Sequence, residues 1–145
     1  RSELSLDPEA RTYTLHRDAR RFQYGPWSWS IVHSWGRAIE YLESIGPTAI
    51  CQRTATLVDD LRTRLGALNG VRVLTPASEY AAALVTFTLD GRSSEAVQAR
   101  LLADANVRVK SVPGSGARLR ASIAVYTSDS DVDRLVEGVA AVVAT

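Results

Sequence analysis

One arginine stands among small and apolar residues in the last third of the sequence. Arg120 lies in a run, from Leu119 to Val125, in which apolar residues alternate with smaller or polar ones. This alternation predicts a strand with two distinct faces, and it sets Arg120 opposite to Leu119 and Ala121. A planar guanidinium offers two parallel N–H donors that match the two oxygens of a carboxylate. Arg120 is therefore a candidate carboxylate-binding residue, and the alternative is a surface arginine paired with a nearby acid.

Other side chains that can carry chemistry occur singly. Lys110 is the one lysine among 17 basic residues, and its position next to Val109 predicts an exposed amine on a strand. Cys51 falls inside an expected helix without a basic neighbour, which is typical of a structural cysteine. His33 has no evident partner acid and favours a surface or interface position. The sequence therefore predicts no metal site.

The elements around Arg120 follow from caps and apolar spacing. Ser128, with Asp131 three residues later, resembles a capping box and predicts the start of a helix. That helix carries one apolar stripe, made of Val132, Leu135, Val136, Val139 and Val143. Upstream, the patterns predict helices over about 30–44 and 47–68, strands over 71–74 and 83–89, a third helix from Ser93 or Ser94 to about 105, and a strand over 107–110.

The resulting element order is α-α-β-β-α-β-β-α. Short strands with polar residues at alternate positions favour an antiparallel or mixed sheet. Together with the amphipathic helices, they predict an α+β fold in which a small sheet is covered on one face by helices and preceded by an extended arm. Residues 1–28 are expected to form the linker or interface arm, and residues 29–145 the domain.

Composition limits the classes of function. A formal net charge of +1 gives no electrostatic basis for binding nucleic acid or an anionic membrane. No run reaches the roughly 20 apolar residues of a membrane span. A single cysteine excludes an internal disulfide and points to the cytoplasm. The absence of methionine favours a fragment or a processed chain, so a further part of the protein is expected outside these 145 residues.

Two segments resemble the class V aminotransferase family of pyridoxal-phosphate (PLP) enzymes, which includes cysteine desulfurases and isopenicillin-N epimerase-like proteins. The run from Leu119 to Val136 is similar to the family's C-terminal signature. Residues 20–26, Arg-Arg-Phe-Gln-Tyr-Gly-Pro, resemble a segment that crosses the dimer interface. The resemblance implies the C-terminal small domain of a fold-type I enzyme, a homodimer, and an amino-acid substrate whose α-carboxylate binds Arg120.

The resemblance also implies where the cofactor is held. The family's Schiff-base lysine lies in a large domain that would precede Arg1, so PLP is expected to be held mainly by that domain and no catalytic residue is expected in this chain. In relatives, a threonine after the glycine reaches the cofactor phosphate of the partner subunit. Here Gly25 is followed by Pro26, Trp27 and Ser28. Pro26 has neither a hydroxyl nor a backbone N–H to offer, so Ser28 or the nearby backbone would replace the threonine.

The reaction stays open among several chemistries. The resemblance implies that cysteine desulfurases carry a nucleophilic cysteine between the third and fourth strands of this domain. The matching loop, residues 111–118, has no cysteine, so persulfide chemistry on it is not expected. Transamination, β-elimination, C–S lysis and epimerisation remain. Two other classes also remain: a non-catalytic amino-acid-binding module that uses Arg120, and a dimerisation module anchored by Trp27, Trp29 and Trp35.

Overall fold

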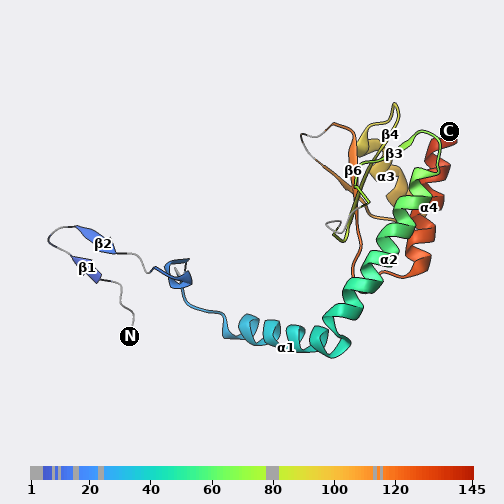
Figure 1. Ribbon diagram of the computed structural model, residues 1–145. Coiled ribbons are helices and arrows are strands. Elements are labelled where there is room, and N and C mark those ends of the chain that lie inside the picture. The colour runs from blue at the N-terminus through green and yellow to red at the C-terminus, as the bar shows by residue number, and fades with distance from the viewer. Residues whose placement is uncertain are drawn as a thin grey trace. The chain divides into compact units, whose positions relative to one another are not determined.

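The computed structural model describes residues 5–7, 9, 11–14, 17–22, 25–77, 82–112, 114 and 116–145. The chain divides into two compact units, residues 1–42 and residues 43–145. Figure 1 shows the elements of both units in chain order. Because each unit is compact by itself, the two are described separately below.

The first unit contains a small hairpin and most of a long helix. Strand β1 (Ser5–Asp7) pairs antiparallel with β2 (Thr12–Thr14), and a short 3₁₀ helix, η1 (Ala19–Phe22), follows. Helix α1 (Trp29–Ile45) starts in this unit, within one residue of the predicted boundaries at both ends. Gly25 and Pro26 lie between η1 and α1, whereas Gln23 and Tyr24 of the family-like segment lie outside the described residues.

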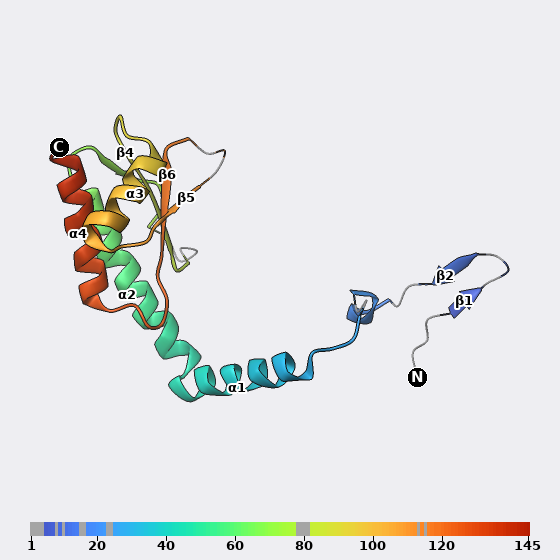
Figure 2. The same ribbon diagram turned by 180° about the vertical axis from the view of Figure 1, so that it is seen from behind.

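The second unit is an open sheet with helices on one face. It contains α2 (Pro47–Gly66), β3 (Val71–Val73), β4 (Leu84–Leu89), α3 (Ser94–Ala105), β5 (Lys110–Ser111), β6 (Arg118–Ser122) and α4 (Asp129–Val143). The strand order is β3-β4-β6-β5, and every neighbouring pair is antiparallel. Figures 1 and 2 both show α2, α3 and α4 on the same side of the sheet. The predicted α+β fold and its element order are confirmed.

Local signals fix the helix ends. Ser128 Oγ accepts a hydrogen bond from the Asp131 N–H, and the Asp131 carboxylate accepts one from the Ser128 N–H, so the predicted capping box is present. Ser93 caps α3 by accepting a hydrogen bond from the Ala96 N–H at 3.2 Å. Pro47 occupies the first turn of α2, directly after Gly46, whose φ of 96° lies in the region that glycine adopts readily. None of the described helices combines the length and the apolar character that a membrane span requires.

The core lies between the sheet and the three helices. Strand β4 alternates in burial, so that every second residue from Val85 to Leu89 is buried. The same alternation buries Leu119 and Ala121 of β6. The helices contribute Leu57, Val58, Leu61, Leu65, Val97, Leu101, Val132, Leu135, Val139 and Val142. The stripe predicted for α4 thus packs on the core, with Val136 and Val143 partly buried at its margin.

Two of the predicted strands have wrong boundaries. The strand expected over 107–110 forms only at Lys110–Ser111, because Asn106 ends α3 in the left-handed conformation and the Val107 N–H bonds the Leu101 carbonyl at 3.1 Å. Residue 107 is therefore held at the helix end and does not pair with a strand. The strand expected to reach Val125 ends at Ser122, since residues 124–127 close a turn.

Candidate functional site

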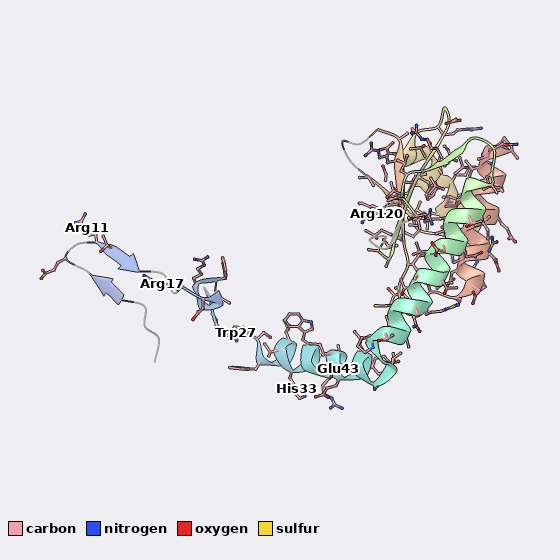
Figure 3. All side chains as sticks on the ribbon, in the orientation of Figure 1. Arg11, Arg17, Trp27, His33, Glu43 and Arg120 are labelled. Atoms are coloured by element: carbon pink, nitrogen blue, oxygen red, sulfur yellow. The ribbon has the colours of Figure 1, made fainter. Side chains whose placement is uncertain are left out.

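Arg120 lies at the centre of β6, an inner strand of the sheet. Its register partners are Thr86 on β4 and Lys110 on β5. The alternation that buries Leu119 and Ala121 under the helices turns Arg120 to the opposite, open face. Figure 3 shows Arg120 on the side of the sheet away from α2 and α4. The predicted strand position of Arg120, opposite to its apolar neighbours, is confirmed.

The guanidinium of Arg120 is poorly satisfied within the protein. The side chain is half-buried, and its Nε atom is buried without a hydrogen-bond partner in the part of the chain that the structure describes. A buried donor without an acceptor is unfavourable, by roughly 1–3 kcal/mol for a typical group. A guanidinium held in this way has its donors free for an external anion. The alternative of an Arg120 ion pair with a neighbouring acid is absent among the described residues.

The open face around Arg120 is basic. The strand residues on this face are Arg72, Leu84, Thr86, Thr88, Lys110, Arg118, Arg120 and Ser122. Four of these eight side chains are cations, none is an acid, and none is aromatic. No ion pair involves any of the four cations within the described ranges. Positive charge without an internal partner makes this face a surface for an anionic group.

The arginines of the helices, unlike the cations of the open face, have acidic partners. Each arginine on α2, α3 and α4 forms an ion pair, in the pairs Arg53–Asp129, Arg62–Asp59, Arg64–Asp133, Arg64–Asp60, Arg100–Asp104 and Arg134–Asp131. The Arg53–Asp129 pair is bidentate, with N–O distances of 2.6 and 3.3 Å, and this hydrogen bonding lowers the pKa of the Asp129 carboxyl. The helices thus pair their arginines, whereas the cations of the open sheet face, like the loop residues Arg92 and Arg108, have no ion pair among the described residues.

A hydrogen-bond cluster fixes the edge strand next to Arg120. Ser111 Oγ lies 2.8 Å from Ser94 Oγ and donates to Glu95 Oε1 at 3.0 Å, while the Ser111 N–H donates to Gln98 Oε1 at 3.0 Å. Ser94 is the buried polar residue of the core. The pKa of the Glu95 carboxyl is lowered, first by a backbone hydrogen bond and then by Ser111. This cluster ties β5 to α3, and sequence reasoning missed it because its members are far apart in the sequence.

The second predicted group, Gly25, Pro26, Trp27 and Ser28, lies in the loop before α1. All four residues are exposed. The Trp27 and Trp29 rings stack with their centroids 6.5 Å apart. The four loop residues, without Trp29, line an open hollow of about 630 Å³ together with Ala19, Phe22, Ile31, Val32 and Trp35. The loop belongs to the first unit and Arg120 to the second, so each group is a separate candidate.

Helix α1 presents an apolar face without a covering layer. None of its residues is buried, and Ile31 and Trp35 are both 69% exposed. Ile39 and Leu42 follow on the same face at helical spacing and are also exposed. A contiguous exposed face of this kind marks an interaction surface. His33 is exposed on the same helix and Cys51 is exposed on α2.

Comparison with known proteins gives a consistent result. Residues 3–135 match the sequence model of the class-V aminotransferase family. A probable cysteine desulfurase 2 from Mycobacterium leprae is 33% identical, over 83% of this chain and 31% of that protein. The apo cysteine desulfurase of Thermococcus onnurineus NA1 superposes with a TM-score of 0.79 at 25% identity, over 99% of this chain and 37% of that one.

A third relative shows the same fold with ligands. The cystine C–S lyase C-DES, in complex with its product cysteine persulfide, superposes with a TM-score of 0.75 at 18% identity, over 94% of this chain and 36% of that one. In a mutant of C-DES, glycine is covalently linked to the PLP cofactor. The chain thus spans about a third of the length of the relatives that it matches.

Proposed function

The chain belongs to the class-V aminotransferase family, and from this premise we propose that it is the C-terminal part of a PLP-dependent enzyme in which Arg120 binds the α-carboxylate of an amino-acid substrate. The observation that carries the proposal is the half-buried Arg120, whose Nε has no partner in the described part of the chain. A carboxylate placed against the guanidinium would accept the donors that the protein leaves unused. On this proposal, Arg120 orients the substrate and takes no part in proton transfer.

The residues of this chain do not fit a PLP site by themselves. Lys110 is the only lysine, and it is exposed on an edge strand. The open-face strand residues include no carboxylate to pair with a pyridine nitrogen and no aromatic ring to stack on it. When bound, PLP supplies an electron sink for bonds at the amino-acid α-carbon. We therefore assign the cofactor mainly to a large domain outside this chain, and we derive no step of the reaction through it here.

The proposed reaction class covers lyase, aminotransferase and epimerase chemistry. Relatives include cysteine desulfurases and a cystine C–S lyase, so chemistry at a sulfur-bearing amino acid is represented among them. The connection between β5 and β6 holds no cysteine, since the chain's single cysteine is Cys51 on α2. A desulfurase reaction with a cysteine nucleophile on this connection is therefore not part of the proposal.

Helix α1 and the loop before it supply the proposed contacts to the rest of the enzyme. The exposed stripe of Ile31, Trp35, Ile39 and Leu42 is a contiguous apolar face and includes tryptophan, a residue type enriched at binding hot spots. We assign this stripe to the dimer contacts. We assign Gly25, Pro26, Trp27 and Ser28 to contacts with the cofactor of the partner subunit. The same observation favours the second candidate function, a dimerisation module without catalysis.

The role of Arg120 is tested in the complete PLP enzyme with Arg120→Ala and Arg120→Lys, and with Arg72→Ala as a control cation on the same face. Arg120→Ala should lower kcat/KM about 100-fold or more, because two charge-assisted hydrogen bonds are lost. Arg120→Lys keeps the positive charge but not the planar guanidinium with its two parallel donors, so kcat/KM should fall less than in Arg120→Ala. Arg72→Ala should change kcat/KM less than about threefold. An unchanged kcat/KM for Arg120→Ala would remove Arg120 from the substrate site.

The interface assignment is tested by light scattering after size-exclusion chromatography. Trp27→Ala and Trp35→Ala should shift the enzyme toward monomer, and His33→Ala, an exposed change on the same helix, should not. Loss of dimers without any effect on amino-acid binding would favour the dimerisation module over the enzyme. A dimer that is unaffected by both tryptophan changes would contradict the assignment.

A further inference from the structure

We propose that Lys110, next to Arg120, forms a second anion site, so that the enzyme prefers amino acids whose side chain carries a carboxylate. The inference rests on the proposed function of Arg120 and names the substrate class of that same site. Four observations carry it: the register of the two cations, the absence of acid from the strands of their face, the pairing of the arginines on the helices of the domain, and the anchoring of β5.

Register places the two cations side by side. Lys110 on β5 is the direct cross-strand partner of Arg120 on β6, so both side chains project from the same face. The Cβ atoms of directly opposed residues lie about 4.5–5.5 Å apart. The two carboxylates of a short dicarboxylic amino acid are separated by only a few bonds and match such a spacing. One carboxylate at Arg120 would thus bring the other within reach of the Lys110 amine.

The arrangement is electrostatically unfavourable without a ligand. Like charges directly opposite each other on a sheet are destabilising. None of the open-face strand residues is an acid that would compensate Lys110 and Arg120. In contrast, the arginines of α2, α3 and α4 all have acidic partners. A second negative charge on the substrate would relieve the repulsion that the protein itself leaves in place.

Lys110 is held in position although its strand is very short. Strand β5 has two residues, and a strand of that length at a sheet edge is prone to fray. Ser111 is nevertheless fixed to α3 by its hydrogen bonds to Ser94, Glu95 and Gln98. The next residue, Val112, donates its N–H to the Arg118 carbonyl at 3.0 Å. These bonds fix the backbone on the C-terminal side of Lys110 and keep it opposite Arg120.

The test measures binding by titration calorimetry of the PLP-loaded enzyme with aspartate against asparagine, and with glutamate against glutamine. In the unchanged enzyme, at least one acid should bind about tenfold or more tightly than its amide, as expected for one charge-assisted contact. Lys110→Gln should abolish most of this acid preference while changing the affinity for the amides less than about twofold. Arg92→Gln, the matched loss of an exposed cation outside the sheet face that has no ion pair among the described residues, should keep the preference.

Four outcomes would overturn the inference. The first is an unchanged enzyme without acid preference, and the second is a preference that survives in Lys110→Gln. The third is a fall in PLP affinity with Lys110→Gln, which would assign the amine to the cofactor phosphate. The fourth is an equal loss of affinity for all four amino acids in Lys110→Gln together with a lower melting temperature, which would show that Lys110 has a structural role. In each case, weaker binding of acids and amides alike by Arg120→Ala would still support the proposed function, and its absence would refute that function separately.

Discussion

On the helix-covered face of the sheet, Val85, Phe87 and Leu119 are completely buried, whereas the open face of the same strands carries Thr86 and Arg120. Adjacent residues of one strand thus serve opposite purposes. The covered face contributes apolar area to the core, and burial of such side chains is the main source of folding free energy. The open face contributes unpaired positive charge, which is unfavourable for the isolated domain and useful only toward an anion.

The two faces differ in how their charges are balanced. Charges that stabilise the domain are paired, as in Arg53–Asp129 and Arg64–Asp133, both at 2.6 Å. On the open sheet face, four cations without an ion pair among the described residues lie around the buried Nε of Arg120. Residues that stabilise the fold and residues proposed to bind a ligand thus lie on opposite faces of the sheet, and substitutions on the two faces should have different effects.

The largest expected effect is on the covered face. Phe87→Ala should lower the free energy of unfolding by about 3–5 kcal/mol, because a fully buried aromatic side chain is removed and a cavity remains. Thr86→Ala, one residue away on the open face, should cost less than about 1 kcal/mol. Urea unfolding of the purified protein measures both. Equal losses at the two positions would contradict the division of the sheet into a stability face and a binding face.

A smaller loss is expected where α3 and α4 meet. A Cβ atom on Gly138 would lie 2.9 Å from Leu101 Cδ2 and 3.1 Å from Ala105 Cβ, so this glycine allows the close approach of the two helices. Gly138→Val should therefore lower the free energy of unfolding by about 2 kcal/mol through overpacking. The neighbouring exposed change Glu137→Val should stay within about 0.5 kcal/mol. A tolerated valine at position 138 would mean that the helix layer is looser than the structure has it.

On the open face, the expected change has the opposite sign. Arg120→Met removes a buried donor that has no partner in the described part of the chain, together with one of two opposed cations. The free energy of unfolding without amino acid should stay the same or rise by up to about 1 kcal/mol. Amino-acid binding should be lost in the same variant. A clear loss of stability would show that Arg120 has a structural role.

The smallest expected effect is the pH-dependent contribution of the Asp131 carboxylate to stability. A backbone hydrogen bond from Ser128 lowers the pKa of the Asp131 carboxyl below its usual value of 3.8. Its stabilising contribution is therefore present above about that value and is lost as the pH falls through the lower folded-state pKa. The denaturation midpoint of the unchanged protein should exceed that of Asp131→Asn at pH 6, and the difference should shrink at pH 3. A difference independent of pH would contradict the role of the charged carboxylate.

Much of this structure could be predicted because its signals are local. Ser128 and Asp131 specify the start of α4 by themselves, and alternation along β6 is enough to separate Arg120 from Leu119. Strand β5 was misplaced because Asn106 ends α3 in a conformation that the apolar pattern of residues 107–110 does not encode. The pairing of Lys110 with Arg120 and the cluster around Ser111 depend on sheet register and on contacts across 13 to 17 residues, which no local pattern contains.

Only part of the candidate site could be predicted from local patterns. Arg120 was found because one arginine interrupts an apolar strand, and its open-face position is as expected. The roles proposed for Gly25, Pro26, Trp27 and Ser28 involve a partner subunit, and no local pattern of one sequence specifies a contact between two chains. The basic character of the open face emerges only when four cations from three strands come together.

Whether Arg120 binds the α-carboxylate can be decided by comparing two ligands in the complete PLP enzyme. The affinities for an α-amino acid and for the same amine without its carboxylate are determined by calorimetry in the unchanged enzyme and in Arg120→Ala. The account predicts that Arg120→Ala weakens the amino acid about 100-fold or more and leaves the amine nearly unchanged. An equal effect on both ligands, or none on the amino acid, would show that Arg120 does not hold the carboxylate.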